Sequence, residues 1–318
     1  MTSELSLGRR RLNVERRAAI ALGSRLVEAS DDPEAFLETL EQGFARLRDP
    51  GSPPDHAMRA PLRRLVRARL GSSLVGASSS SALNVAARLE RSTSREVRLF
   101  ALPFLERALE VEPERAWQSL RRLGRGSQDR IEVDALAVVW AQGVLGERFR
   151  WAELEQLVYS ARAMERRLVA ATLASIPVRL PEAERGQLRD DLGRHVLPTL
   201  AMLMGDADDA VQRALGRAIR AWTPLDPSAI EAFLRDQAAI AGEHRDGYRA
   251  RVVRDALRGQ PDAVAADLRR LLTGLRRRPG DPSSSLAARQ AAAFTVALSD
   301  DFGAAHAVQG ERFARSRA

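Results

Sequence analysis

The chain has 318 residues, of which 50 are basic and 42 acidic, so its formal net charge is +8 at neutral pH. Apart from the four histidines every basic residue is an arginine, because the chain contains no lysine, and it contains no cysteine either. These absences exclude disulfides, thiolate metal sites, cysteine nucleophiles, Schiff-base lysines and the phosphate loop that depends on a lysine.

Helix signals recur along the whole chain, and strand signals are nearly absent. Alanine, leucine, arginine and glutamate dominate the composition, and these residues favour helices. A basic arm at 1–12 precedes the first apolar periodicity. Helix starts follow, where a capping side chain or a first-turn proline precedes an apolar pattern, at 32–33, 127–129, 208–209, 226–227 and 260–262. The sequence therefore predicts an all-α fold.

A weak motif recurs through the predicted helices. It joins an acidic or polar start, a hydrophobic residue beside arginine and an alanine–leucine pair, and it appears at 94–102, 128–139, 163–173, 208–218 and 247–257. Its marker positions lie 36, 33, 46 and 38 residues apart, at Arg98, Asp134, Arg167, Arg213 and Arg251. Irregular periods of about 35 to 45 residues are typical of HEAT-type helix pairs. We predict a HEAT-like helical-repeat solenoid over 13–278, followed by a linker and a C-terminal helical tail at 279–318; an irregular helical domain is the alternative.

Two arginine stripes fall on predicted helices. Arg213, Arg217 and Arg220 share one helix face, and Arg251, Arg254 and Arg258 share another, with no matching acid apart from Asp255. In a solenoid such stripes on successive second helices merge into one basic concave groove. Guanidinium groups bind phosphates in a bidentate way, so the stripes favour a nucleic-acid partner. The alternative is that they are ordinary solvated helix faces.

Arginines also crowd one segment in the first half of the chain. Arg63, Arg64, Arg67 and Arg69 lie close together without an acid among them. Arg121, Arg122, Arg125 and Arg130 likewise flank the turn at 124–127. Solvated helix faces explain most surface arginines individually.

Asp134 is the most unusual acid in the sequence, since it lies in an otherwise apolar helix within a turn or two of its start. An acid near a helix N-terminus is favoured by the helix dipole. The functional interpretation is a carboxylate on the concave face that stabilises a developing cation or activates water. Trp140 and Trp222 are predicted core residues.

The sequence also limits where the protein is expected to act and which metals or cofactors it is expected to use. No run of about 18 apolar residues suggests a membrane span, and the first residues lack the apolar core of a secretory signal. The four histidines are too few and too scattered for a histidine-built metal site. We expect a cytoplasmic monomer that uses no metal, no cofactor and no membrane.

The stretch from about 128 to 258 resembles the HEAT-like DNA alkylation-repair glycosylases of the AlkD type. The segments that carry the resemblance are VDALAVVWAQGVLGERF, RRLVAATLASI, LMGDADDAVQRALGRAIRAWTPLDPSAIEAFL and RDGYRARVVRDAL. The resemblance implies a helical solenoid that wraps DNA against a basic concave face. It also implies that active members excise N3- and N7-alkylated purines without a metal, by contacting the backbone at the lesion rather than flipping the base into a pocket.

The resemblance further implies roles for single residues. The catalytic aspartate of the family falls on Asp134. Two aromatic positions that should embrace the cationic nucleotide fall on Arg130 and near Arg217, and the phosphate-gripping arginine is expected around Arg167, next to Arg166. Replacing aromatic rings by arginine removes a cation–π interaction that would stabilise the transition state, but it keeps or improves phosphate binding.

We expect a DNA-binding protein that recognises damaged or distorted DNA, double-stranded or structured, through arginine–phosphate contacts. Two versions stay open: a metal-independent monofunctional glycosylase that uses Asp134, and a binder without catalysis, which the aromatic replacements favour. A HEAT-type scaffold that binds an acidic protein partner is the alternative from another class. The predicted DNA-binding residues are Arg130, Arg166, Arg167, Arg213, Arg217, Arg220, Arg251 and Arg254.

Overall fold

The computed structural model describes residues 2–47, 60–74, 79–278 and 280–293. These residues form helices joined by short turns and contain no strand, which confirms the predicted all-α class. The chain divides into two compact units, Met1–Gly146 and Glu147–Ala318, so the boundary lies inside the predicted repeat domain 13–278. A division of this kind is natural in a repeat fold, because each helix pair contacts mainly its neighbours.

The first unit contains eight labelled α-helices among its described residues. Their bounds are α1 (Thr2–Glu28), α2 (Pro33–Leu47), α3 (Ala60–Ser73), α4 (Ser79–Glu90), α5 (Arg95–Arg98), the 3₁₀ turn η1 (Leu99–Ala101), α6 (Leu102–Val111), α7 (Pro113–Gly126) and α8 (Arg130–Gly146). The predicted basic arm at 1–12 is no separate element in its described part, because α1 runs without a break from Thr2.

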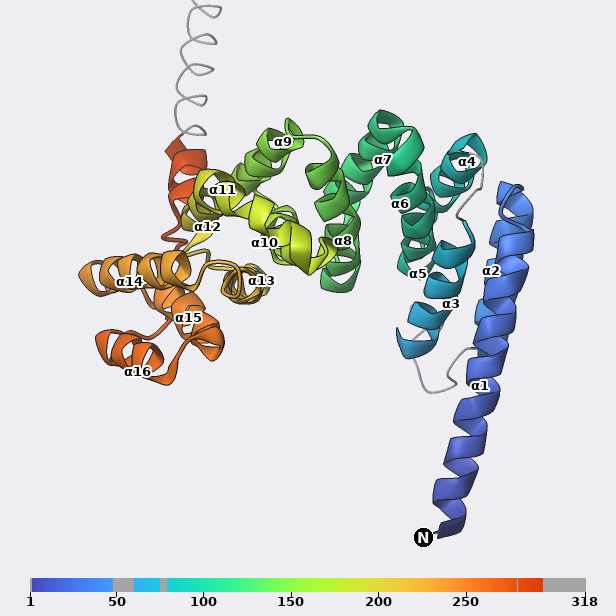
Figure 1. Ribbon diagram of the computed structural model, residues 1–318, viewed down its shortest axis with the longest axis horizontal. Coiled ribbons are helices and arrows are strands. Elements are labelled where there is room, and N and C mark those ends of the chain that lie inside the picture. Colours follow the sequence, from blue (N-terminus) through green and yellow to red (C-terminus); the bar gives the residue numbers. More distant parts are fainter. Residues whose placement is uncertain (1, 48–59, 75–78, 279, 294–318) are drawn as a thin grey trace, which may run out of the picture. The chain divides into compact units, whose positions relative to one another are not determined.

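These helices pack in two layers (Figure 1). In one layer α1 contacts α3, α3 contacts α6, and α6 contacts α8. In the other layer α2 contacts α4, and α4 contacts α7. Contacts between α1 and α2, α4 and α6, and α6 and α7 join the layers. Each helix of the first unit thus contacts mainly its near neighbours along the chain.

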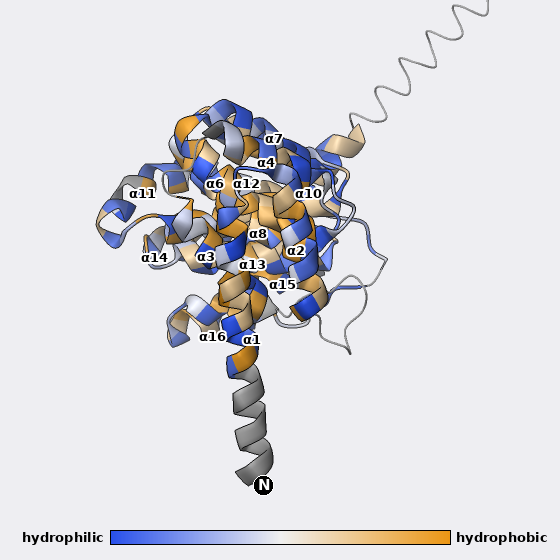
Figure 2. Ribbon diagram, turned by 90° about the vertical axis from the view of Figure 1, so that its right-hand side faces the viewer, coloured by the Kyte–Doolittle hydropathy of each residue, from blue (hydrophilic) through white to orange (hydrophobic). Residues whose placement is uncertain are grey.

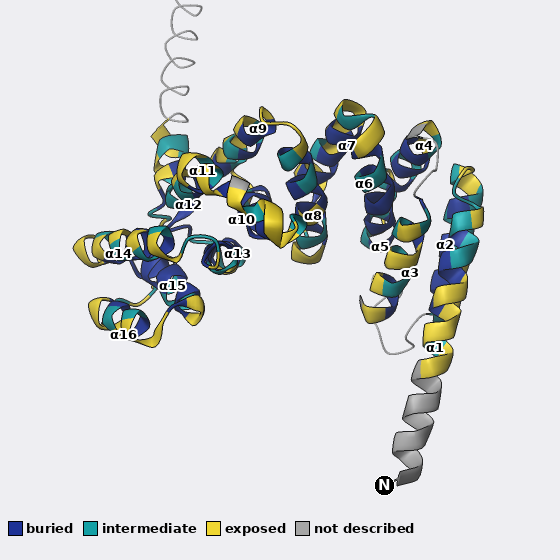
Figure 3. Cartoon of the chain, in the orientation of Figure 1, coloured by how far each residue is buried: buried dark blue, intermediate teal, exposed yellow. Residues whose placement is uncertain are grey.

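The second unit continues with α9 (Arg150–Gln156), η2 (Leu157–Tyr159), α10 (Ala163–Arg179), η3 (Glu182–Gln187), α11 (Leu188–Asp191), the π-helix η4 (Leu192–Val196), α12 (Leu197–Leu203), α13 (Asp209–Trp222), α14 (Pro227–Glu243), α15 (Gly247–Ala256), η5 (Leu257–Gly259) and α16 (Asp262–Leu271). One layer runs from α10 through α13 to α15, and α14 contacts both α15 and α16. Figure 3 shows broad buried surface on α13 and α15 and more exposed surface on α14 and α16.

Four of the five predicted helix starts are confirmed by capping contacts, and α16 begins at Asp262, within the fifth, without a side-chain cap. The side-chain oxygens of Asp32, Asp129, Asp208 and Asp226 accept hydrogen bonds from backbone N–H groups two or three residues further on, at 2.8 to 3.3 Å. Pro33 and Pro227 occupy first helical positions, where the missing N–H costs nothing. None of the described helices is both long and apolar enough to cross a bilayer.

The core consists of the apolar faces of amphipathic helices, and most helices carry both hydrophobic and hydrophilic residues (Figure 2). Trp140 and Trp222 are buried, which confirms them as core residues. Their indole N–H groups donate to the carbonyls of Leu120 and Leu173 at 3.3 and 2.7 Å. Each buried indole thus has the hydrogen-bond partner that its polar atom needs.

Arginine–carboxylate contacts connect successive helix pairs at a nearly constant spacing. The pairs join residues between 32 and 40 positions apart, and they are Arg63–Glu96, Arg98–Glu132, Arg166–Asp206, Arg220–Asp255 and Arg235–Asp267. In each case one helix is tied to a segment of the following pair. Other arginine–carboxylate pairs span different distances in the chain, such as Arg88–Glu34 and Arg277–Asp209.

The described residues around the start of the predicted linker at 279–318 pack within the second unit. The hydroxyl of Ser283 donates to the carbonyl of Gly205 at 3.2 Å, and the hydroxyl of Tyr248 donates to the carbonyls of Arg278 and Asp281 at 3.1 and 2.7 Å. Residues 286–293 are helical, with Ser285 capping them through Ala288 N–H. The rest of the predicted tail, 294–318, lies outside the described residues.

Candidate functional site

Three arginines of the predicted stripes lie at the surface of α13 and α15. Arg213 and Arg217 are exposed on α13, and Arg251 is partly exposed on α15. The two helices approach closely at Gly216, where an added Cβ would lie 2.3 Å from the carboxylate of Asp255. Because α13 and α15 are neighbours in one layer, arginines from both helices meet at their N-terminal halves.

The carboxylate of Asp209 holds these arginines together. It pairs with Arg213 one turn further along α13, and its Oδ1 lies 2.5 Å from Nη2 of Arg251. Arg277, from the segment after α16, places Nη1 at 3.2 Å from the same oxygen. We call Asp209, Arg213, Arg251 and Arg277 the Asp209 cluster. Three positive charges and one negative charge leave two positive charges on a fixed surface.

Arg277 reaches the cluster because its segment is held in place. Its guanidinium carbon lies 6.0 Å from the centroid of the Tyr248 ring, a cation–π distance. The hydroxyl of the same tyrosine donates to the carbonyls of Arg278 and Asp281, so one side chain of α15 fixes the chain just after Arg277. The cluster therefore combines three segments that are far apart in sequence.

The expectation that Asp255 alone would match the stripes is wrong, because Asp209 pairs with both Arg213 and Arg251. Asp209 precedes Arg213 by four residues, so the i,i+4 rule for helices would have found this pair. The pairing of Arg277 with Asp209 could not be predicted by this rule, since the two residues lie 68 positions apart in the chain.

Four other predicted DNA-binding arginines make contacts inside the second unit. Arg220 donates to the carbonyl of Asp255 at 2.6 Å and pairs with its carboxylate at 3.0 Å. Arg254 donates to the carbonyls of Leu272 and Leu275 at the end of α16, both at 2.6 Å, and burial lowers its pKa. Arg167 is buried and donates to the carbonyl of Ala210. These contacts hold α10, α13, α15 and α16 together.

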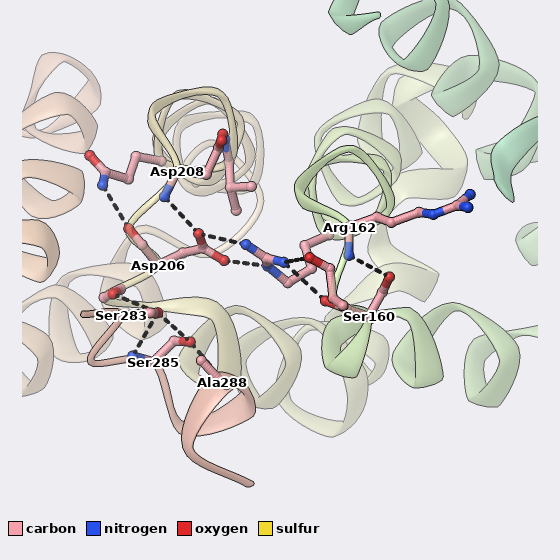
Figure 4. A network of polar contacts seen from close by, with 12 residues as sticks. Ser160, Arg162, Asp206, Asp208, Ser283, Ser285 and Ala288 are labelled. Atoms are coloured by element: carbon pink, nitrogen blue, oxygen red, sulfur yellow. Dashed lines mark hydrogen bonds and ion pairs between the residues drawn. The ribbon is translucent and has the colours of Figure 1, made fainter. Parts of the chain in front are cut away.

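The fourth of these arginines, Arg166, belongs to a polar network near the N-terminus of α10. Figure 4 labels its partners Ser160 and Asp206. Its Nε and Nη2 donate to the two carboxylate oxygens of Asp206 at 2.6 and 3.1 Å, and its Nη1 donates to the carbonyls of Ser160 and Ala161 at 2.9 and 3.1 Å. Asp206 is fully buried and also accepts the backbone N–H of Asp208 at 2.9 Å. The network thus sets the position at which α13 begins.

In the first unit, α8 carries Asp134 and Arg130. Arg130 is exposed at the start of the helix, and Asp134 follows one turn later, half-buried. Ile131 and Val138, each 38% exposed, lie on the same side of the helix as Asp134. Asp129 already caps the helix, and Glu132 lies in its first turn. Asp134 is therefore an acid on a partly apolar, partly exposed face of α8, while Asp129 caps the helix and Glu132 pairs with Arg98.

The aromatic positions implied by the resemblance are arginines on exposed helix faces, Arg130 on α8 and Arg217 on α13. All four tryptophans are buried: Trp117 packs against Trp140, Trp151 stacks on His195 with the ring centroids 4.8 Å apart, and Trp222 is the last residue of α13. The described residues also contain no group of three or more His, Asp or Glu side chains arranged to hold a metal ion.

Comparison with known families agrees with this geometry. The family model described as DNA alkylation repair enzyme matches residues 56–258, a stretch that includes α3 to α15. Comparisons with curated proteins and with solved structures gave no significant match. The matched stretch is more than half of the chain and contains Asp134 and the Arg213 and Arg251 helices, and we conclude that this chain belongs to the family of DNA alkylation repair enzymes.

Proposed function

We propose that the protein binds DNA in alkylation repair and that Arg213, Arg217, Arg251 and Arg277 hold backbone phosphates. The observation that supports this most is the Asp209 cluster, in which arginines from three separate segments converge at the surface of the second unit. We leave Arg166, Arg167, Arg220 and Arg254 out of this surface, because their guanidinium groups serve contacts within the unit.

The arrangement suits a polyanion for a simple electrostatic reason. Asp209 orients three guanidinium groups, so less side-chain entropy is lost when they bind, but it neutralises only one of their charges. Arginine offers two parallel N–H groups to the oxygens of a phosphate. Phosphates bound in this way release counterions from the DNA, which makes binding depend steeply on salt.

A salt titration of duplex binding tests the proposal. We expect the logarithm of the association constant to fall with the logarithm of salt concentration with a slope of about −3 or steeper, since each neutralised phosphate contributes about −0.9. Fluorescence anisotropy of a labelled duplex gives the slope. A shallow slope together with tight binding of an acidic protein would instead favour the scaffold.

We further propose that Asp134 supports base excision. In the reaction the C1′–N bond of an alkylated purine breaks, its electron pair neutralises the cationic base, and a water adds to the sugar cation at C1′. A carboxylate beside C1′ stabilises that cation and accepts the proton of the attacking water. The half-buried position of Asp134 among partly exposed apolar residues supports this role, because a low-dielectric surrounding strengthens such an interaction.

Asp134→Asn is expected to reduce the release of 7-methylguanine or 3-methyladenine from alkylated DNA by about 10²–10⁴-fold, the usual contribution of a general base. Duplex affinity and melting temperature should stay unchanged, because the substitution is nearly isosteric. Chromatography of the released bases measures the effect. If the wild-type protein releases neither base, the protein is a binder without catalysis.

A further inference from the structure

A hollow of about 640 Å³ lies between α3 and α6 in the first unit. Its charged and hydroxyl-bearing lining residues are Arg64, Arg67, Ser72, Glu106, Arg107 and Glu110. Three arginines and two glutamates leave one positive charge in the hollow. None of these side chains belongs to the Asp209 cluster or to α8.

Arg67 is the distinctive residue of this hollow. Its Nε is buried and has no hydrogen-bond partner, and no ion pair joins its guanidinium to any of the residues that the structure describes. One turn earlier, Arg63 pairs with the buried Glu96, which also pairs with Arg95. The buried carboxylate of Glu96 is therefore already paired with two other arginines, and the charge of Arg67 has no direct counterion among the described residues.

The electrostatic surroundings agree with this geometry. Burial has the largest effect on the pKa of Arg67 and lowers it, and repulsion by Arg63 lowers it as well; Glu106 and Glu96 each raise it by a smaller amount, which leaves the pKa at about 10. The guanidinium remains charged at neutral pH, so the fold keeps a poorly compensated cation at this position. A bound anion would supply the missing countercharge.

Arg107 is a second arginine of the hollow that has a buried N–H group without a hydrogen-bond partner. Its Nε is also buried without a hydrogen-bond partner among the described residues, while its Nη1 pairs with Glu110 on the exposed side of α6. Exposed pairs three residues apart on a helix are weak. An anion in the hollow can therefore compete with Glu110 for this arginine.

We propose that the hollow between α3 and α6 binds a phosphate group through Arg67, with Arg64 and Arg107 as further donors. A tetrahedral phosphate offers several oxygens to guanidinium groups that approach from two helices. Because the lining carries one net positive charge, a singly charged phosphodiester balances it, whereas a free phosphate dianion meets the repulsion of Glu106 and Glu110. The expected ligand is thus a backbone phosphate of nucleic acid, in addition to those proposed for the Asp209 cluster.

Arg67→Met tests the site. Removing a buried charge that has no partner should raise the melting temperature, while duplex affinity falls and the salt slope becomes shallower by about 1. Arg115→Met is the matched control, because Arg115 is an exposed arginine of α7 that pairs with Glu112; its slope should not change. Arg67→Gln, which keeps a polar side chain, should show the same loss of slope if Arg67→Met folds poorly.

A second measurement tests this site separately from duplex binding by the Asp209 cluster. A dinucleoside monophosphate, which carries one phosphodiester, should raise the melting temperature of the wild type but not of Arg67→Met. The shift should persist even if the salt titration of duplex DNA refutes the proposed function. A shift with inorganic phosphate alone would overturn the phosphodiester assignment, and equal responses of wild type and Arg67→Met to both probes would overturn the site.

Discussion

Changing Arg213, Arg217 and Arg251 together to glutamate is expected to abolish duplex binding at physiological salt. The three substitutions change the charge of the α13–α15 surface by six units, and they surround Asp209 with further carboxylates. Each arginine that binds a phosphate contributes about one unit to the salt slope, so any residual binding should show a slope shallower by about 3. Anisotropy with a labelled duplex measures both quantities.

The matched control changes three other exposed arginines of the second unit, Arg189, Arg194 and Arg269, to glutamate. The net charge falls by the same amount, but the Asp209 cluster stays intact. We expect this variant to lose only the modest, salt-sensitive attraction that any cation gives to DNA. Equal losses in the two variants, with unchanged helicity by circular dichroism, would mean that the α13–α15 surface has no special role.

Asp206→Ala is expected to destabilise the second unit by about 3–5 kcal/mol, since it leaves the largely buried charge of Arg166 without its partner. The same change frees the backbone N–H of Asp208, which Asp206 also accepts. Urea unfolding followed by circular dichroism measures the loss. Asp236→Ala, on the exposed side of α14, should change stability by less than about 0.5 kcal/mol.

A double variant distinguishes the free energy lost by leaving the charge of Arg166 unpaired from the free energy lost through poorer packing. Arg166→Met combined with Asp206→Leu replaces the pair by apolar side chains, and such replacements of buried ion pairs are often close to neutral. We expect the double variant to be more stable than Asp206→Ala alone. The reverse order of stability would show that the carbonyl contacts of Arg166 with Ser160 and Ala161 dominate the network.

Much of the fold could be predicted from local sequence signals. Asp129, Asp208 and Asp226 mark helix starts because a side-chain oxygen satisfies N–H groups only two or three residues away. Trp140 and Trp222 were predictable core residues since they lie in apolar runs. The HEAT-like repeat inferred from the spacing of the motif stays a prediction.

The partners of single arginines could not be predicted in the same way. Arg213 and Arg220 lie on one predicted stripe, yet Arg213 reaches the surface and Arg220 is tied to Asp255 on α15. The guanidinium of Arg254 donates to the carbonyls of Leu272 and Leu275, just after the end of α16. A helical period places these residues roughly on one side, but which of them meets solvent depends on the helix packed alongside.

The sequence by itself determined the all-α class, most of the helix starts and the resemblance that the family match confirms, because all of these depend on residues close together in the chain or on the pattern as a whole. The tertiary structure alone decided that Arg251 and Arg277 join Arg213 at Asp209 and that Arg67 lacks a counterion within the described parts of the chain. Those outcomes depend on contacts across 30 or more residues, such as Arg63–Glu96 and Arg277–Asp209, and a long flexible side chain takes its partner from whatever the fold brings within reach.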